Sequence, residues 1–186
     1  MILDQWKYPA LAKPDSDSAY TYYVQRRISV WFSVRLASFM GPNGATAIDL
    51  IFGVTATVLV LLNHWLLGVV LIQFFGIFSC VDGEIARIRG RSSKIGDFLD
   101  TLTDRFTELL VVGAISWSLG TRVEDPASAL AAGFALLGGV FLLTISSEKY
   151  RSAWQTAYPK RKLERSFDLF CAGSDTRLLM LSIGLI

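Results

Sequence analysis

Long apolar runs constrain this chain more than any other feature of its sequence. Of its 186 residues, 52% are hydrophobic, and its mean hydropathy of +0.44 is too high for an ordinary soluble domain. A membrane-spanning helix needs about 20 residues at a rise of about 1.5 Å per residue. We therefore predict an all-α integral membrane protein, a helical bundle of five transmembrane helices. The expected spans are about 45–63, 65–82, 97–119, 126–148 and 167–186.

The last of these runs is only marginally long enough to cross a bilayer. If it begins near residue 167, then Asp175 and Arg177 lie inside it, and charged groups are costly at that depth. One interpretation is that the sequence stops short of a sixth helix.

Two different segments precede the first run. Residues 1–24 are polar and interrupted by proline, and they lack the basic-then-apolar pattern of a secretory signal, so we expect no cleaved peptide. Residues 25–40 place apolar side chains at helical spacing among Arg and Ser residues. This pattern predicts an amphipathic helix in the membrane interface, anchored by Trp31, although a soluble helix packed on a partner is an alternative. The membrane domain is thus expected over residues 25–186.

Basic residues are confined to alternate connections between the runs. The segments before the first run, between the second and third, and between the fourth and fifth are rich in Lys and Arg. The other two connections hold only His64 in one case, and Arg122 with two acids in the other. The positive-inside rule places the basic connections in the cytoplasm. We therefore expect a multi-pass protein of the cell (inner) membrane with a cytoplasmic N-terminus.

Three acidic residues interrupt the apolar pattern on this same side of the membrane. Asp82 ends the second run, and Asp100 and Asp104 share one face of the next predicted helix because they are four residues apart. Ionisable groups at such positions are costly and indicate function. Converging carboxylates suit one or two divalent cations such as Mg²⁺, and one carboxylate can also act as a general base toward a hydroxyl. A buried salt-bridged network is the alternative interpretation.

The residues that follow Asp82 suit a phosphorylated ligand. Gly83 and Ala86 leave the backbone open to close approach, and three arginines between residues 87 and 91 supply positive charge for phosphate. The acids and bases together indicate a cytoplasm-facing site for phosphoryl-type transfer.

The spacing of these residues resembles the signature of the CDP-alcohol phosphotransferase family. Residues 82–87 read D-G-E-I-A-R and match D-G-x-x-A-R, and Gly96, Asp100 and Asp104 follow at the family's intervals. Residues 42–46 match the P-N-x-x-T with which the family's first span begins. Most of the chain, from about residue 26 onward, resembles the family's six-helix core without its last helix.

This resemblance implies a reaction and a set of site residues. Enzymes of this family displace CMP from a CDP-linked donor such as CDP-diacylglycerol, as a hydroxyl of a small acceptor alcohol attacks the β-phosphorus. The resemblance implies a homodimer and two Mg²⁺ or Mn²⁺ ions held by Asp82, Asp100 and Asp104, with Asp104 also the expected base. The residues implied to bind the CDP moiety are Thr46, Asp82, Gly83, Ala86, Arg87 and Gly96.

One position departs from the family pattern. The family has another Asp three residues before Asp82, and this chain has Ser79 there. A hydroxyl carries no charge to offset two dications, so we expect reduced metal affinity at one site and reduced turnover. Three explanations remain open: an engineered substitution, partial replacement by Glu84 or Asp97, or a catalytically weak relative.

The acceptor is indicated less sharply. The motif looks more like the inositol-phosphate-using branches than the aminoalcohol branches, and four basic residues later in the chain fit a phosphate-bearing polyol. They are Lys149, Arg151, Arg165 and Arg177. The alternative roles of these bases are interfacial anchoring and contact with anionic headgroups.

Two other classes of function compete with the enzyme. A non-catalytic relative would bind CDP-lipid or metal as a scaffold, and Ser79 is its support. A cation transporter would place its acids near the bilayer midplane, whereas these acids cluster at one face beside arginines. The chain lacks base-stacking aromatics in a basic groove, so we expect no nucleic-acid partner.

Overall fold

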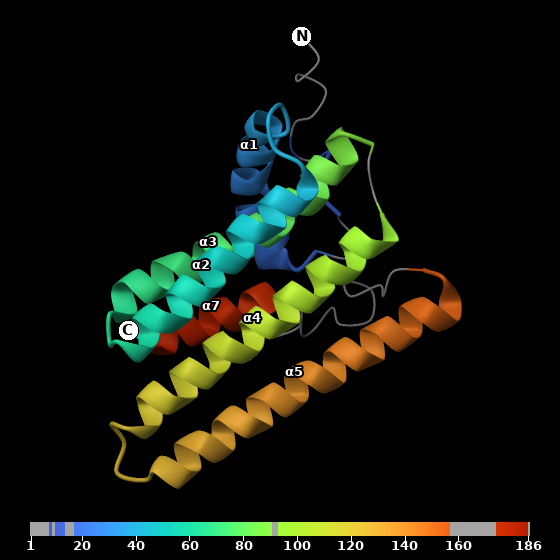
Figure 1. Cartoon of the computed structure of the whole chain (residues 1–186). Helices are drawn as coiled ribbons and strands as arrows, with labels where there is room; N and C mark the ends of the chain where they lie inside the picture. The colour runs from blue at the N-terminus through green and yellow to red at the C-terminus, as the bar shows by residue number, and fades with distance from the viewer. Residues whose placement is uncertain (1–7, 9, 14–16, 91–92, 157–173, 186) are drawn as a thin grey trace.

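The computed structural model describes residues 8, 10–13, 17–90, 93–156 and 174–185, and these form helices joined by short turns (Figure 1). A short π-helix, η2, precedes a bundle of longer helices. The elements are η2 (Thr21–Gln25), α1 (Arg26–Leu36), α2 (Pro42–Leu61), α3 (Trp65–Ile88), α4 (Lys94–Gly120), α5 (Pro126–Trp154) and α7 (Ser174–Leu185). The prediction of an all-α helical bundle is therefore confirmed.

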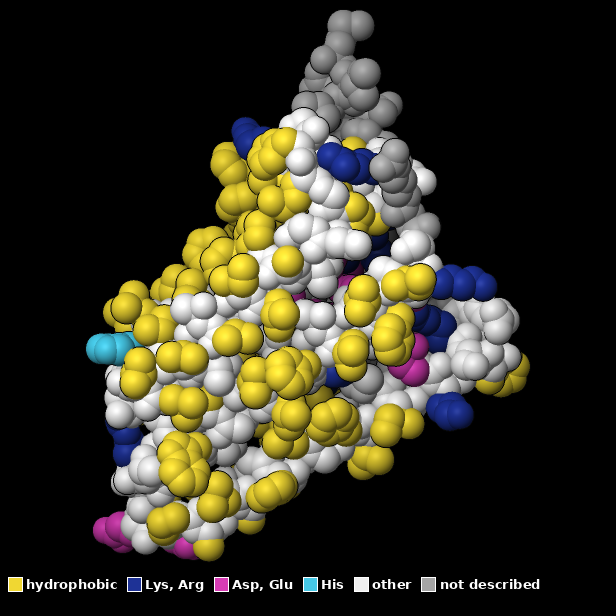
Figure 2. Space-filling view, viewed as in Figure 1, with side chains coloured by type: hydrophobic (Ala, Val, Ile, Leu, Met, Phe, Trp, Pro, Cys, Tyr) yellow, Lys and Arg dark blue, Asp and Glu magenta, His cyan; other side chains and the backbone are white. Residues whose placement is uncertain are grey.

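Three of these helices, α2, α3 and α5, are long and apolar enough to cross a membrane. Helix α4 has 27 residues but carries the acidic stripe in its first half, and the described part of the last predicted span is the 12-residue α7. Residues 167–173 of that predicted span lie outside the described residues. Figure 2 shows hydrophobic side chains spread over the face formed by α2, α4 and α5, as expected for surfaces in contact with lipid.

Helix α3 continues past the predicted end of its span at residue 82 and runs to Ile88. It does so because Val81 and Ile85 are fully buried and pack with Ala45 and Phe78 in a core between α1, α2 and α3. The D-G-E-I-A-R motif therefore lies on a continuous helix. Its residues are consequently presented at fixed helical angles and not on a loop.

A second core joins α2, α3, α4 and α7. The helices approach closely here: a Cβ atom added at Gly53 of α2 would lie 2.0 Å from Cγ2 of Thr107 on α4. This contact holds the acidic half of α4 against the α2–α3 hairpin, so the two motif-bearing helices are fixed relative to each other.

Helix α1 buries three polar residues against the protein, while two of its large apolar side chains face outward beside the exposed Arg27 and Arg35. Arg26, Ser29 and Ser33 are buried, whereas Ile28 is 40% exposed and Trp31 is 53% exposed. The predicted amphipathic helix is confirmed over Arg26–Leu36, shorter than the expected 25–40. An outward apolar face with Trp31 is the arrangement that a helix in the membrane interface requires.

Candidate functional site

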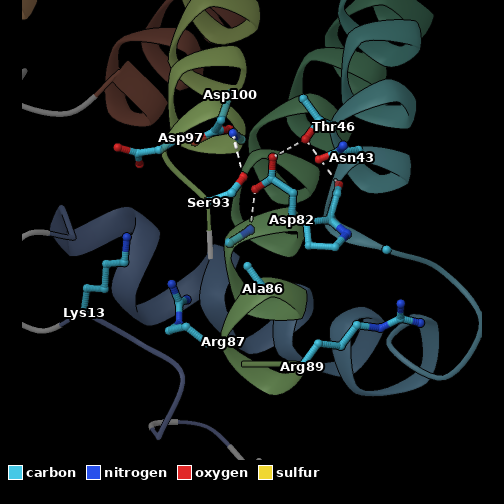
Figure 3. A pocket seen from close by; sticks show the side chains of 14 residues that line it. Lys13, Asn43, Thr46, Asp82, Ala86, Arg87, Arg89, Ser93, Asp97 and Asp100 are labelled. Carbon is cyan, nitrogen blue, oxygen red and sulfur yellow. Dashed lines mark hydrogen bonds between the residues drawn. The ribbon is translucent and has the colours of Figure 1, made fainter. Parts of the chain in front are cut away.

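A cavity of about 680 Å³ opens at one end of the bundle, where the start of α2, the end of α3 and the start of α4 meet (Figure 3). Its wall combines acidic residues, basic residues and small residues that leave the backbone accessible. The lining residues are Lys13, Gly41, Pro42, Asn43, Thr46, Asp82, Gly83, Ala86, Arg87, Arg89, Ser93, Gly96, Asp97 and Asp100.

Helices α2 and α3 orient the Asp82 carboxylate from two directions. Pro42 begins α2, where the missing N–H of proline costs nothing, and one turn later Thr46 Oγ1 donates to Asp82 Oδ2 at 2.8 Å. The backbone N–H of Gly83 donates to Asp82 Oδ1 at 2.5 Å. Both oxygens are therefore held in place, so the P-N-x-x-T and D-G-x-x-A-R segments act as one unit.

Helix α4 contributes the opposite wall. It begins at the cap residue Ser93, whose Oγ accepts from the Gly96 N–H at 3.0 Å. The first two turns then place Asp97 and Asp100 on the cavity. The Asp82 and Asp100 carboxyl groups lie close enough for their charges to interact. Two ionised carboxylates so placed repel each other, and a bound cation would relieve that repulsion.

Asp104 lies one turn further along α4 and faces Ser79. The Ser79 Oγ donates to Asp104 Oδ2 at 3.2 Å. The negative charge of Asp104 also acts on Asp100. Neither Ser79 nor Asp104 lines the cavity. Within the described part of the chain, no three His, Cys, Asp or Glu side chains are gathered closely enough to hold a metal ion. The structure thus brings together the Asp82–Asp100 pair, and the three-carboxylate site stays a prediction.

Glu84 does not point toward the acids. Its carboxylate is fully buried on the other side of α3 and accepts from Ser29 Oγ at 2.8 Å, from Ser33 Oγ at 2.6 Å and from Arg26 Nη1 at 2.8 Å. All three of these hydrogen bonds come from α1, so Glu84 faces away from Ser79 and does not replace the missing carboxylate there. Asp97 does line the cavity, but its side chain is largely exposed and pairs with Arg151.

All six residues expected to bind CDP line this one cavity, and Asp100 lines it with them. The bases expected to bind the acceptor are not gathered at one place. Arg151 Nη2 reaches the cavity residue Asp97 at 2.8 Å, and Lys149 is exposed on the same helix. Arg165 lies outside the described residues.

Arg177 belongs to a separate charged cluster deeper in the bundle. Its Nη2 lies 3.2 Å from Glu108 Oε1, and Arg105 pairs with the other Glu108 oxygen and contacts Thr144 on α5. Glu108 is about 16 Å further along α4 than Asp97 at a rise of about 1.5 Å per residue. The cluster borders an apolar groove of about 440 Å³ between α4, α5 and α7.

Several cavity residues were missed by the interpretation of the sequence. Asn43 belongs to the P-N-x-x-T segment and Ser93 has the residue type and place of a helix cap, so both left a signal in the sequence. Lys13 left none, because it lies in a polar segment that shows no periodicity. Its position depends on Asp17, which holds the Lys13 backbone and is itself held by Arg26 of α1.

Comparison with known proteins places this geometry in context. Residues 39–182 match the sequence model of a family described as CDP-alcohol phosphatidyltransferase. This range includes the cavity-lining segments of α2, α3 and α4, while Lys13 and the whole of α1 precede it.

Individual relatives agree with the family match. A protein of Archaeoglobus fulgidus, named bifunctional IPC transferase and DIPP synthase, is 31% identical over 143 residues, covering 77% of this chain and 28% of the relative. A protein of the same name from Thermococcus kodakarensis is 29% identical over 142 residues, covering 76% and 32%. The phosphatidylinositol phosphate synthase of Corynebacterium glutamicum is 34% identical over 99 residues, covering 52% and 44%. The chain therefore spans about a third or less of the first two relatives and under half of the third.

Proposed function

The chain belongs to the CDP-alcohol phosphatidyltransferase family, and on that premise we propose that it transfers a substituted phosphoryl group from a CDP-alcohol, such as CDP-diacylglycerol, to the hydroxyl of a small polyol or polyol phosphate. The released product is CMP. One observation carries this proposal: the six residues at the family's CDP-binding positions, Asp82 among them, line a single cavity together with Asp100.

The acids suit a divalent cation, Mg²⁺ or Mn²⁺. Asp82 and Asp100 present hard oxygen donors on one cavity, and a bound cation would relieve the repulsion between their charges. We assign Asp82, Asp100 and Asp104 to hold the cation. Ser79 stands at the fourth acidic position of the family pattern, and that pattern implies two ions. When bound, such a cation neutralises charge on the diphosphate of the donor.

The residues of the chain divide the remaining work between them. Arg87 and the small residues Gly83 and Ala86 bind the cytidine diphosphate, and Thr46 holds Asp82 in position. Asp104 takes the proton of the acceptor hydroxyl as the hydroxyl oxygen bonds to the β-phosphorus. The bond from that phosphorus to the bridging oxygen breaks at the same time, and CMP leaves. The donor phosphoryl group thus ends as a phosphodiester.

A phosphate-bearing acceptor, such as an inositol phosphate, fits the bases around the site. The Corynebacterium glutamicum relative is named a phosphatidylinositol phosphate synthase, so the product in its name contains an inositol phosphate. Lys149 and Arg151 lie on α5, and Arg151 donates to the cavity residue Asp97. The Arg105–Glu108–Arg177 cluster carries two positive charges against one negative charge, so Arg177 can also receive an anion. Arg165 completes the set proposed from the sequence.

We further propose a place for the protein in the cell. The basic connections support a multi-pass protein of the cell membrane with its site on the cytoplasmic face, and the resemblance to the family supports a homodimer.

The proposed activity is tested with purified protein in detergent or lipid nanodiscs. With Mg²⁺ or Mn²⁺ present, we expect CMP release from CDP-diacylglycerol only when an acceptor is added, with inositol phosphate faster than free inositol or an aminoalcohol. Chelation of the metal should stop release. Binding of CDP-diacylglycerol without release for any acceptor would support the second candidate, a scaffold that binds CDP-lipid, which Ser79 favours.

Metal affinity provides a prediction about Ser79. Because the Ser79 hydroxyl lies 3.2 Å from the Asp104 carboxylate, Ser79→Asp adds a second carboxylate beside Asp104. We expect it to tighten Mn²⁺ binding by about tenfold or more, since affinity follows the charge of the ligand set, and to raise the rate of CMP release. The measurement is a Mn²⁺ titration followed by electron paramagnetic resonance.

The control for this prediction is Ser79→Asn, because an asparagine side chain has nearly the shape of an aspartate side chain and carries no charge. We expect its Mn²⁺ affinity to stay near or below that of the unsubstituted chain. Equal affinities and rates for Ser79 and Ser79→Asp would contradict the assignment of this position to the metal site.

A further inference from the structure

The polar segment before α1 packs against the motif-bearing turn of α3. Leu11, which is 1% exposed, accepts through its backbone oxygen from Arg87 Nη2 at 3.0 Å. Six residues later in the chain, Asp17 is likewise buried at 6% exposure. Both ends of this segment are therefore fixed to the protein, and Lys13 lies between them.

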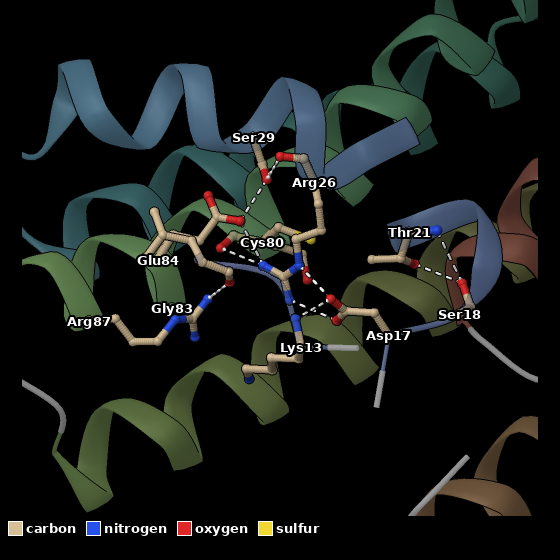
Figure 4. A network of polar contacts seen from close by, with 12 residues as sticks. Lys13, Asp17, Ser18, Thr21, Arg26, Ser29, Cys80, Gly83, Glu84 and Arg87 are labelled. Atoms are coloured by element: carbon tan, nitrogen blue, oxygen red, sulfur yellow. Dashed lines mark hydrogen bonds and ion pairs between the residues drawn. The ribbon is translucent and has the colours of Figure 1, made fainter. Parts of the chain in front are cut away.

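An ion-pair chain holds the segment in place (Figure 4). Arg26 donates from Nε and Nη2 to the two oxygens of Asp17, both at 2.9 Å, and from Nη1 to Glu84 at 2.8 Å. Asp17 Oδ2 also accepts from the backbone N–H of Lys13 at 2.7 Å, and its own N–H donates to the Lys13 oxygen at 2.8 Å. The backbone of Lys13 is thus tied through Asp17 and Arg26 to the buried Glu84 of the motif helix.

Lys13 faces the cavity from this position. Its side chain lines the wall and remains partly exposed to solvent at the opening. Figure 3 shows Lys13 and Arg87 on one side of the cavity and Asp97 and Asp100 on the opposite side. Among the described residues, no acidic side chain forms an ion pair with the Lys13 ammonium group.

Two arginines, Arg87 and Arg26, act on the charge of Lys13. The pKa of Lys13 is lowered from its ordinary value, first by loss of hydration and then by the positive charges of Arg87 and Arg26, against the opposing charge of Asp17. Asp17 and Glu84 form their ion pairs with Arg26, and within the cavity the charge of Lys13 also interacts with that of Asp82. An anion placed beside Lys13 and Arg87 would therefore be attracted by both side chains.

We propose that Lys13 is a further ligand-binding residue, which contacts the diphosphate of the cytidine nucleotide beside Arg87. This inference rests on the proposed function, because it takes the cavity to be the nucleotide site, and it adds the segment before α1 to that site. A lysine ammonium group is a flexible point charge that follows phosphate oxygens without needing a fixed angle. The Asp17–Arg26–Glu84 chain is the positioning device that brings it there.

The test compares binding of two probes, CDP and cytidine, to the purified full chain in detergent with Mg²⁺, by isothermal titration calorimetry. Lys13→Gln keeps most of the side-chain length and removes the charge. We expect Lys13→Gln to weaken CDP binding by about tenfold, the size of one charge-assisted hydrogen bond that is partly exposed, and to leave cytidine binding unchanged. Lys13→Arg should restore most of the CDP affinity.

The matched control is Lys94→Gln, which removes an exposed lysine near the start of α4 that does not line the cavity; CDP binding should be unchanged. Equal CDP affinity for Lys13→Gln and the unsubstituted chain would overturn the inference and leave the proposed function standing. Parallel losses for CDP and cytidine would also overturn it, since they indicate a structural role. Failure of the unsubstituted chain to bind CDP would overturn both.

Discussion

Asp104→Asn is expected to lower kcat for CMP release by about 10²- to 10⁴-fold, the range by which a positioned general base accelerates a reaction. The amide keeps the shape of the carboxylate and can still accept from Ser79 Oγ, which lies 3.2 Å from Asp104 Oδ2, but it cannot take the proton of the acceptor. Because Asp104 does not line the nucleotide cavity, we expect KM for the CDP-alcohol to change much less than kcat. The measurement is steady-state CMP release at saturating Mg²⁺.

The control for this prediction is Glu124→Gln, an equal removal of charge at an exposed acid in the connection between α4 and α5. Its kcat should match that of the unsubstituted chain. A loss of less than about tenfold in Asp104→Asn at saturating metal would assign the proton to another group. A rise in the metal concentration needed for half-maximal rate would show that Asp104 also serves as a ligand, as proposed.

Arg26→Met is the substitution with the largest expected effect on stability. The Asp17 and Glu84 side chains are 6% and 0% exposed, and Arg26 is the cation that both of them contact. Removing one partner of a buried ion pair leaves an uncompensated buried charge and typically costs about 3 to 5 kcal/mol of unfolding free energy. We therefore expect a clear fall in the midpoint of thermal unfolding in detergent micelles, followed by tryptophan fluorescence.

The neighbouring Arg27 offers a matched control on the same helix. It is exposed and lies 5.4 Å from the centre of the Tyr8 ring, so Arg27→Met should change the unfolding free energy by at most about 0.5 kcal/mol. Adding Glu84→Gln to Arg26→Met removes one of the stranded charges and should recover part of the loss, which is non-additivity between residues in contact. Equal midpoints for Arg26→Met and Arg27→Met would show that the ion-pair chain does not stabilise the protein.

Much of the fold could be predicted because membrane-spanning helices leave a local signal. Residues 65–82 and 126–148 are apolar over a whole span, and both became helices that begin at the expected residue. Boundaries beyond the apolar runs were less accurate. Helix α3 extends to Ile88 because packing of Ile85 against α1 and α2 continues the helix past Asp82, where the apolar run ends.

The candidate site was predictable where its residues share one helix or one motif. Asp100 and Asp104 are a helical turn apart, so helical geometry alone places them on one face. The role of Glu84 was not predictable in this way. Glu84 is one of the residues expected to replace the missing ligand in part, but residues two apart on a helix point in different directions, and Glu84 faces α1.

The sequence by itself determined the helical bundle, because hydropathy acts over a few turns of one chain segment, and the family, because the motif residues stand at fixed intervals. The six residues at the family's CDP-binding positions were predicted from that resemblance, and they line one cavity. Only the tertiary structure decided the contacts that close the site. These are the approach of Asp82 to Asp100, the contact of Ser79 with Asp104, and the ion-pair chain that brings Lys13 to the cavity. Each joins different helices or segments of the chain, and their approach depends on how the helices pack.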